Sequence, residues 1–291
     1  MHVVECISDT RDELGESPIW IEEENSIYWV DIKRFLIHKL DTINNQYTSW
    51  QFNESIGSIA HINEEFFIAG TQSGFKFVNL KSNMLTPIVD PEPEYKSNRF
   101  NDGKCDNKGR FYAGTMNEID NKPTGSFYIF YNDLTYKKFD EEYIITNGPA
   151  FSPDGSIIYF TDTRKGEIYT SNLNDDGTLI EKKLFISIPS NEGKPDGMTV
   201  DEEGFIWVAI FGGSCVNRYD KQGKKVDSIE MPVSCITSCV FGGENLDTLF
   251  ITSASFKLND LQKNNEPQAG SLFKTKLNIK GNKTNKFIQS N

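Results

Sequence analysis

The chain has 291 residues, of which 12% are aromatic and 22 are glycine, and its formal net charge is −12. Nucleic acid is not an expected partner, because binding a phosphate backbone requires a basic surface and this chain is strongly acidic. Metal cations are more favourable ligands by charge. The length would allow two ordinary domains, but a repeat that spans nearly the whole chain argues for one.

The repeat is a unit of about 40 to 50 residues that recurs six times. In each copy a polar or small residue precedes a turn-rich stretch and then an aromatic or apolar strand. The register points are Glu16, Gly57, Asn101, Asn147, Asp196 and Ser238, separated by steps of 41, 44, 46, 49 and 42 residues. The strands that follow them lie at 27–30, 66–68, 111–113, 158–160, 206–208 and 249–251. Short strands without a long amphipathic helix predict an all-β fold, a six-bladed β-propeller.

The two ends of the chain bear on how this ring closes, because an open sheet edge would otherwise remain at the seam. Residues 3–7 are predicted to share one blade with the late strand at 271–275. Residues 259–268, rich in Asn, Lys and Pro, are predicted to form a surface loop. The chain from about 282 is expected to be a loose tail. The sequence therefore predicts a single propeller domain over 1–291 with a central metal site.

The sequence shows no pattern typical of export or of membrane insertion. The first thirty residues contain no secretory signal pattern, and no apolar run has the length needed to span a bilayer. The five cysteines are odd in number and irregular in spacing, which indicates reduced core thiols and not a disulfide framework. We therefore expect a soluble, cytoplasmic protein without a membrane partner. A monomer is expected because no coiled-coil pattern is present.

Two common catalytic styles are not supported by the residues. The three histidines are His2, His38 and His61, and none lies in the register set. A Ser-His-Asp arrangement is therefore not expected, because serine would have no base to activate it. No Gly-rich phosphate loop precedes a helix either, which argues against nucleotide chemistry.

An oxygen-ligand metal site is the chemistry that remains. Glu16 and Asp196 each bring a carboxylate and Asn147 brings an amide oxygen, and equivalent positions should converge where the repeats converge. Ca²⁺, Mg²⁺ and Mn²⁺ prefer such ligands, whereas Zn²⁺ is less favoured by ligand softness. The simpler alternative for any one motif is a turn, since Asn-Gly and Asp-Gly are common turn pairs. Four motifs in register favour a site for one divalent ion.

Several segments together resemble a known family. They are Leu14–Trp20, Asn98–Lys104, Ala113–Met116, Thr146–Pro149, Lys194–Met198 and Thr237–Gly243. They are similar to the motif set of the senescence marker protein, gluconolactonase and regucalcin-like family, and the likeness covers nearly the whole chain. The resemblance implies a six-bladed propeller that hydrolyses sugar lactones to aldonic acids with a divalent metal. It implies Glu16, Asn147 and Asp196 as metal ligands, and Arg99 and Asn101 as substrate contacts.

The chain departs from the family pattern at two places. Pro149 follows Gly148 where the family usually has leucine, and proline fixes φ locally. The family tends to place an acidic substrate-binding residue just after Gly-Thr-Met, and Glu118 is the nearest candidate here. Substrate selectivity lies in such loops, so the particular sugar lactone stays open.

The expected mechanism is attack of water on the lactone carbonyl, polarised by the metal. Asp196 is the best candidate for the catalytic base, and Asp102 is an alternative whose simpler role is to close the turn at 101–103. Three other functions stay open. One is a calcium-binding regulatory protein without catalysis, another is hydrolysis of another ester or phosphoester at the same site, and the third is a propeller that serves only as an interaction platform.

Overall fold

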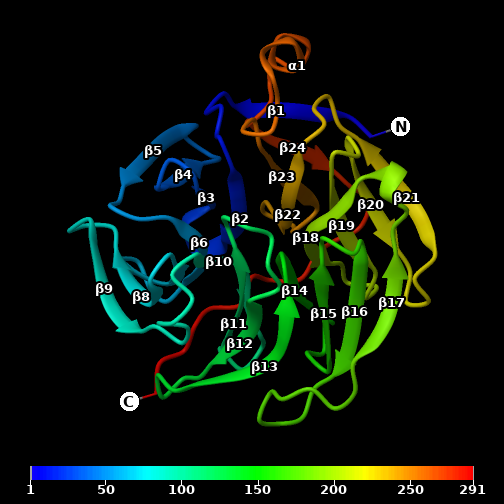
Figure 1. The fold of residues 1–291 in the computed structure, drawn as a ribbon. Coiled ribbons are helices and arrows are strands. Elements are labelled where there is room, and N and C mark those ends of the chain that lie inside the picture. The colour runs from blue at the N-terminus through cyan, green and yellow to red at the C-terminus, as the bar shows by residue number, and fades with distance from the viewer. Residues whose placement is uncertain (1, 291) are drawn as a thin grey trace.

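The computed structural model describes residues 2–290, and almost all of its regular structure is β-sheet (Figure 1). Six four-stranded antiparallel sheets surround a central axis as the blades of a propeller. The prediction of an all-β, six-bladed β-propeller is therefore confirmed. Among the described residues, no helix is both long and apolar enough to cross a membrane.

The strands of each blade are given from the axis outward. Blade one contains β2 (Gly15–Ile21), β3 (Ser26–Asp31), β4 (Leu36–Asp41) and β5 (Gln46–Gln51). Blade two contains β6 (Ile56–His61), β7 (Phe66–Thr71), β8 (Gly74–Asn79) and β9 (Met84–Val89). Blade three contains β10 (Asn98–Cys105), β11 (Phe111–Asn117), β12 (Gly125–Phe130) and β13 (Tyr136–Tyr143).

Blade four contains β14 (Thr146–Phe151), β15 (Ile157–Asp162), β16 (Glu167–Asn172) and β17 (Lys183–Ser187). Blade five contains β18 (Lys194–Val200), β19 (Ile206–Phe211), β20 (Cys215–Tyr219) and β21 (Lys225–Glu230). Blade six contains β22 (Ile236–Gly242), β23 (Thr248–Ser253), β24 (Leu272–Lys276) and β1 (Val4–Ser8). The short helices are η1 (Glu22–Glu24), η2 (Ser190–Glu192) and α1 (Asp260–Asn265).

The core lies between neighbouring blades, which explains the aromatic strands of the repeat. All residues of β3 are buried, whereas β5 at the outside of the same blade is mostly exposed. Tyr28 contacts Phe67 of blade two with ring centroids 5.3 Å apart, and Phe127 of blade three contacts Phe160 of blade four at 5.4 Å. Offset and tilted aromatic pairs of this kind stabilise packing beyond the area they bury. The blades are thus held to one another through their faces.

The inner strands approach each other closely around the axis, in the ring order β2, β6, β10, β14, β18 and β22. At Gly57 in β6, a Cβ atom would lie 2.3 Å from the carbonyl oxygen of Phe100 in β10. Glycine is therefore required at this register point by backbone contact, and blade two has no side chain to offer to the axis there.

The seam of the ring is closed as the sequence predicts. β1 pairs antiparallel with β24, with Val4 opposite Thr275 and Cys6 opposite Phe273. The N-terminal strand is therefore the outer edge of the last blade, and no unpaired edge remains between the first and the last blade.

The segment at 259–268 differs from the predicted loop because it contains α1. Asn259 caps this helix: its side chain accepts a hydrogen bond from the N–H of Gln262, and the Gln262 side chain accepts one from the N–H of Asn259. Such a capping box satisfies two of the free N–H groups at a helix start. The helix projects from the ring beside blade six (Figure 1).

The segment from residue 282 onward has no regular secondary structure, but it is not the loose tail expected from its composition. It runs behind the ring in Figure 1 and ends beside blade three. The N–H groups of Phe287 and Ile288 donate to the carbonyl oxygens of His61 at 2.8 Å and Gly109 at 3.1 Å. The Phe287 ring is 2% exposed and belongs to the apolar cluster between blades two and three. One buried aromatic side chain and backbone hydrogen bonds hold the segment down.

Replacement of Phe287 by alanine is expected to lower the free energy of unfolding by about 3 kcal/mol, because it removes a buried ring and leaves a cavity. Urea unfolding of the purified protein measures the change. Ile288→Ala is the matched control, since this neighbour is 57% exposed and its loss should cost under about 0.5 kcal/mol. Equal effects of the two substitutions would contradict an anchoring role for Phe287.

Candidate functional site

The predicted site residues lie where the inner strands begin and where their pairing is interrupted. Four bulges fall between Glu16 and Ile19, Phe100 and Gly103, Asn147 and Ala150, and Pro195 and Met198. A bulge takes residues out of the ladder and re-aims their side chains. Pro149 lies inside one of them, where a missing N–H removes no ladder hydrogen bond.

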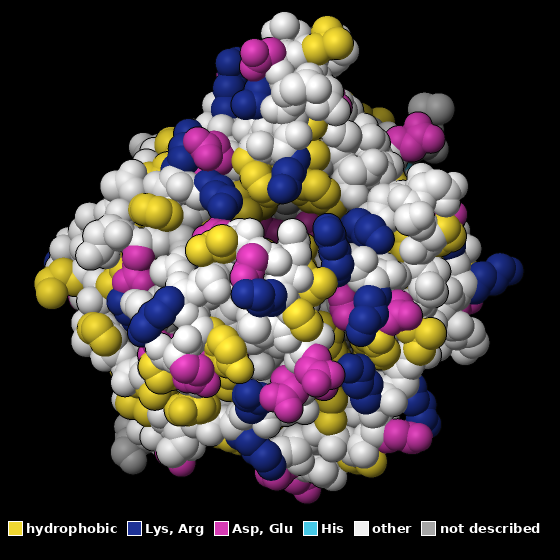
Figure 2. All heavy atoms as spheres, viewed as in Figure 1, with side chains coloured by type: hydrophobic (Ala, Val, Ile, Leu, Met, Phe, Trp, Pro, Cys, Tyr) yellow, Lys and Arg dark blue, Asp and Glu magenta, His cyan; other side chains and the backbone are white. Residues whose placement is uncertain are grey.

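All four bulges lie at one end of the central channel. The start of each inner strand pairs with the end of the next strand outward, as Gly15 pairs with Asp31 and Lys194 with Phe211. Figure 2 shows this end of the propeller, with a central hollow that has acidic side chains at its depth. The repeat therefore converges on one site, as its register predicts.

Hydrogen bonds run from the predicted substrate contact Asn101, through the predicted ligand Asn147, to the residue that precedes the predicted ligand Asp196. The Asn101 side chain donates from Nδ2 to Oδ1 of Asn147 at 3.0 Å. Asn147 in turn donates from Nδ2 to the hydroxyl of Thr163 at 2.8 Å, which fixes the orientation of its amide. The Thr163 hydroxyl donates to the carbonyl oxygen of Pro195 at 2.8 Å, directly before Asp196. The amide oxygen of Asn147 is thereby held in place beside the start of β18.

Three carboxyl groups are buried together near these amides. Glu16 is 4% exposed, Asp196 is 6% exposed and Asp102 is 2% exposed. Burial, and then the neighbouring charge of Asp102, raises the pKa of Glu16 to about 8. Burial, followed by the charges of Glu16 and Asp102, raises the pKa of Asp196 well above its usual value. Because Asp102 acts on Glu16 and both act on Asp196, the three buried groups lie near one another in a poorly solvated space.

Asp102 is better satisfied by the protein than the other two acids. Its Oδ1 accepts from the N–H of Gly103 at 2.8 Å and its Oδ2 accepts from the N–H of Gly148 at 3.1 Å. Burial raises the pKa of Asp102 to about 6, while Lys104 and these two N–H groups act in the opposite direction. Both oxygens are therefore engaged in fixing the bulges of β10 and β14.

The donor set fits a hard divalent cation. Glu16 and Asp196 are buried acids, the charge of Glu16 raises the pKa of Asp196, and a doubly charged ion between them would offset that repulsion. The carboxylate of Glu16 accepts a hydrogen bond from the Ser17 N–H at 3.0 Å, and further lone pairs stay available. Within residues 2–290, no cluster of three or more His, Cys, Asp or Glu side chains has metal-binding geometry. The fit thus rests on two carboxylates plus the amide oxygen of Asn147.

The remaining two predicted residues extend this network outward. Arg99, 3% exposed, donates from Nη1 to Oδ1 of Asn101 at 2.8 Å and from Nε to Oε1 of Glu118 at 3.0 Å. No residue between 2 and 290 accepts a hydrogen bond from its Nη2. Burial opposes the charge on Glu118, but Arg99 and Lys33 together hold its pKa below the usual value. Hydrogen bonds therefore join Glu118, Arg99, Asn101 and Asn147, and the charge of Arg99 acts to lower the pKa values of the nearby Glu16 and Asp196.

Two participants are absent from the sequence prediction, namely Thr163 and Lys33. Thr163 orients Asn147, and the Lys33 ammonium lies 2.5 Å from Oε1 of Glu118. Both follow the second strand of their blade, as Glu118 does in blade three. The repeat could have indicated these two positions, because the ends of the second strands adjoin the starts of the inner strands.

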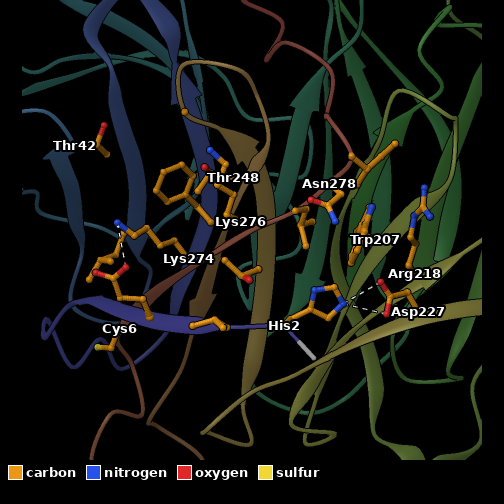
Figure 3. Close-up of a pocket in the computed structure, with 18 of the residues that line it drawn as sticks. His2, Cys6, Thr42, Trp207, Arg218, Asp227, Thr248, Lys274, Lys276 and Asn278 are labelled. Carbon is orange, nitrogen blue, oxygen red and sulfur yellow. Dashed lines mark hydrogen bonds and ion pairs between the residues drawn. The ribbon is translucent and has the colours of Figure 1, made fainter.

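A cavity of about 1210 Å³ lies away from this site, beside β1 and β24 (Figure 3). Several of its charged side chains form ion pairs: His2 lies 3.0 Å from Asp227, and Lys274 lies 3.3 Å from Glu5. Residues of blades one, five and six line it, and none of the predicted site residues is among them.

Comparison with known proteins agrees with the motifs. Residues 14–255 match the model of a family described as the SMP-30/gluconolactonase/LRE-like region. A Bacillus subtilis protein provisionally named a sugar lactone lactonase is 33% identical over 276 residues, 94% of each chain. Regucalcin of Gallus gallus is 32% identical over 286 residues, 96% of each chain.

The fold comparison gives the same result. A crystal structure described as a calcium-binding protein, regucalcin, from Agrobacterium tumefaciens aligns with a TM-score of 0.94 and 26% identity. The alignment covers 98% of this chain and 97% of that chain. With a family match over most of the sequence and relatives above 30% identity along nearly its full length, this chain belongs to the SMP-30/gluconolactonase/LRE-like family.

Proposed function

We propose that this protein is a divalent-metal-dependent lactonase that hydrolyses a sugar lactone, of the gluconolactone type, to the aldonic acid. The observation that carries the proposal is the buried group of Glu16, Asp196 and Asn147, with Arg99 and Asn101 beside it. Family membership and a relative named as a sugar lactone lactonase support the reaction class. A relative named as a calcium-binding protein supports a divalent ion.

Glu16, Asn147 and Asp196 would hold one ion, with Ca²⁺, Mg²⁺, Mn²⁺ and Zn²⁺ as the candidates. Two carboxylates and one amide oxygen leave coordination positions for water and substrate. When bound there, the ion supplies Lewis-acid polarisation of the lactone carbonyl.

The substrate would be held by groups with free hydrogen-bonding capacity. Arg99 has its Nη2 available to donate to a sugar oxygen, and Glu118 has its Oε2 available to accept from a sugar hydroxyl. Asn101 fixes both Arg99 and Asn147 through its side chain. Such fixed contacts would orient the lactone and lower the entropic cost of reaching the transition state.

Asp196 would act as the general base. Its carboxylate would take a proton from the water that attacks the carbonyl carbon, the ring C–O bond would break, and the ring oxygen would receive a proton to become a hydroxyl. Asp196 suits this role better than Asp102, because both Asp102 oxygens already accept backbone hydrogen bonds. The net reaction adds one water and yields a carboxylic acid.

The setting proposed for this reaction is the cytoplasm, with a small-molecule substrate and a monomeric enzyme. All five cysteines are free, two of them partly exposed, which suits a reducing compartment. No nucleic-acid or membrane partner is proposed, because the net charge of −12 disfavours anionic surfaces.

Acid release in weakly buffered solution tests the function. Chelated protein should be inactive towards glucono-, galactono-, xylono- and arabinono-lactones, and protein reloaded with one of the four ions should turn over at least one of them above spontaneous hydrolysis. The rates of the different lactones and ions, compared with one another, would identify the preferred substrate and the preferred ion. Tight binding of Ca²⁺ without turnover of any lactone would favour the calcium-binding alternative, and turnover of other esters would favour the broader hydrolase.

A further inference from the structure

The outer part of the site is built by the loops that follow the second strands of the blades. Lys33 follows β3, Glu118 follows β11, Phe211 ends β19 and Phe256 follows β23. These strand ends adjoin the starts of the inner strands, so the four side chains belong to the same end of the channel as the buried acids. We call them the rim.

One of the rim residues, Lys33, is held in position by its backbone. Asp31, fully buried at the end of β3, accepts hydrogen bonds from the N–H groups of Lys33 and Arg34, both at 3.1 Å. The same carboxylate accepts from the N–H of Leu14 at 3.2 Å, next to the start of β2. The turn that carries Lys33 is therefore fixed to the inner strand, which holds the backbone of Lys33 in a defined position.

Two cations converge on one oxygen of Glu118. Lys33 approaches Oε1 at 2.5 Å and Arg99 donates to the same atom at 3.0 Å. The side chains of Lys33 and Glu118 are 31% and 28% exposed, whereas that of Arg99 is 3% exposed. The network therefore leads from the buried ligand Asn147 out to solvent at Lys33.

The Phe256 ring of the rim lies near both Lys33 and a second lysine, Lys257, which is not itself part of the rim. Lys33 Nζ lies 5.9 Å from the centroid of the Phe256 ring, and Lys257 Nζ lies 5.1 Å from it. Phe211 packs against the same ring at 6.3 Å. Figure 2 shows dark blue and yellow side chains around the central hollow. Two cations therefore share one oxygen of Glu118, and a third lies beside the Phe256 ring, in a chain whose net charge is −12.

We propose that Lys33, with Lys257 beside the same ring, selects lactones that carry an anionic group remote from the ester carbonyl. The inference rests on the proposed lactonase function and names its substrate class. The ester would lie at the buried acids, and a carboxylate or phosphate at the other end of the substrate would meet Lys33.

The test compares three lactones: glucono-1,5-lactone, which is neutral, glucaro-1,4-lactone, which carries a carboxylate, and 6-phosphoglucono-1,5-lactone, which carries a phosphate. Values of kcat and KM are measured at a fixed free concentration of the activating ion. The native protein should favour at least one anionic lactone by about ten-fold in kcat/KM, mainly through KM, because a hydrogen bond to a charged group adds that much affinity. The preference should shrink as salt is raised.

Four variants assign the preference. Lys33→Met should lower kcat/KM for the favoured anionic lactone by at least about five-fold more than for the neutral lactone, Lys33→Arg should retain the preference, and Lys257→Met should reduce it. Lys165→Met is the matched control, because Lys165 lies on the equivalent turn of blade four and pairs with Asp162 at 3.0 Å. It should leave the ranking unchanged.

Other outcomes overturn the proposal in distinct ways. Equal kcat/KM for all three lactones, or an equal loss for all three in Lys33→Met, would show that Lys33 only holds Glu118, with the lactonase function intact. No turnover of any lactone would refute the proposed function and this inference with it. Preference for only the carboxylate or only the phosphate would identify which anion the rim binds.

Discussion

Asp196→Asn is expected to reduce lactone turnover by about a thousand-fold, within the range for loss of a positioned general base. The substitution keeps the size of the side chain but removes the charge that would help to hold the ion and the lone pair that would take the proton. Because burial already disfavours the charged form of Asp196 and asparagine is neutral and of the same size, the fold should tolerate the change. Turnover and bound ion are measured on the same sample, the latter by elemental analysis.

The matched control is Asp102→Asn. Both oxygens of Asp102 accept backbone N–H groups, so an amide there would leave one N–H facing another donor and should lower stability. Turnover per ion-loaded molecule should fall by less than about ten-fold. Near-native turnover of Asp196→Asn with the ion retained, together with a large loss in Asp102→Asn, would move the role of base to Asp102.

The ring and the position of its site could be predicted from the sequence because they follow from one period. Equivalent points of a closed repeat must lie at equivalent distances from the axis, so Glu16, Asn147 and Asp196 had to converge once six units were recognised. Asn101 sits at the same register point in blade three, and Arg99 lies two residues before it, opposite Met116. The bulges that turn these side chains inward were not predicted, since they depend on how each inner strand meets its neighbour.

The rim and the C-terminal segment depend on contacts that composition does not reveal. Lys33 in blade one reaches Glu118 in blade three, 85 residues away, and no local pattern encodes that pair. The segment after residue 282 is rich in lysine and asparagine, so its composition predicts an exposed tail. The one aromatic residue that anchors it, Phe287, contributes little to that overall composition. α1 had a local signal in Asn259 and Gln262, the two ends of a capping box, within a stretch whose overall polarity indicated a loop.

Binding of the divalent ion is expected to release protons near neutral pH. With a pKa of about 8, Glu16 is mostly protonated at pH 7 before the ion binds, and the ion requires the carboxylate. Affinity should therefore rise by about ten-fold per pH unit for each proton displaced between pH 6 and 8. Calorimetry in buffers of different ionisation enthalpy counts the protons. Glu16→Gln should bind the ion more weakly and release fewer.

The same titration sets the sign of the stability change in chelated protein. The folded-state pKa of Glu16 lies above its unfolded value, so the stability from keeping the proton is full at low pH and is lost as pH rises towards 8. The free energy of unfolding should fall by about 1.4 kcal/mol per pH unit for each such group. Glu16→Gln should flatten this slope, whereas Glu13→Gln, at an exposed neighbour, should not. A chelated protein that becomes more stable from pH 6 to 8 would mean that the acids at the axis are already compensated by the protein, and that the ion is not needed to hold them there.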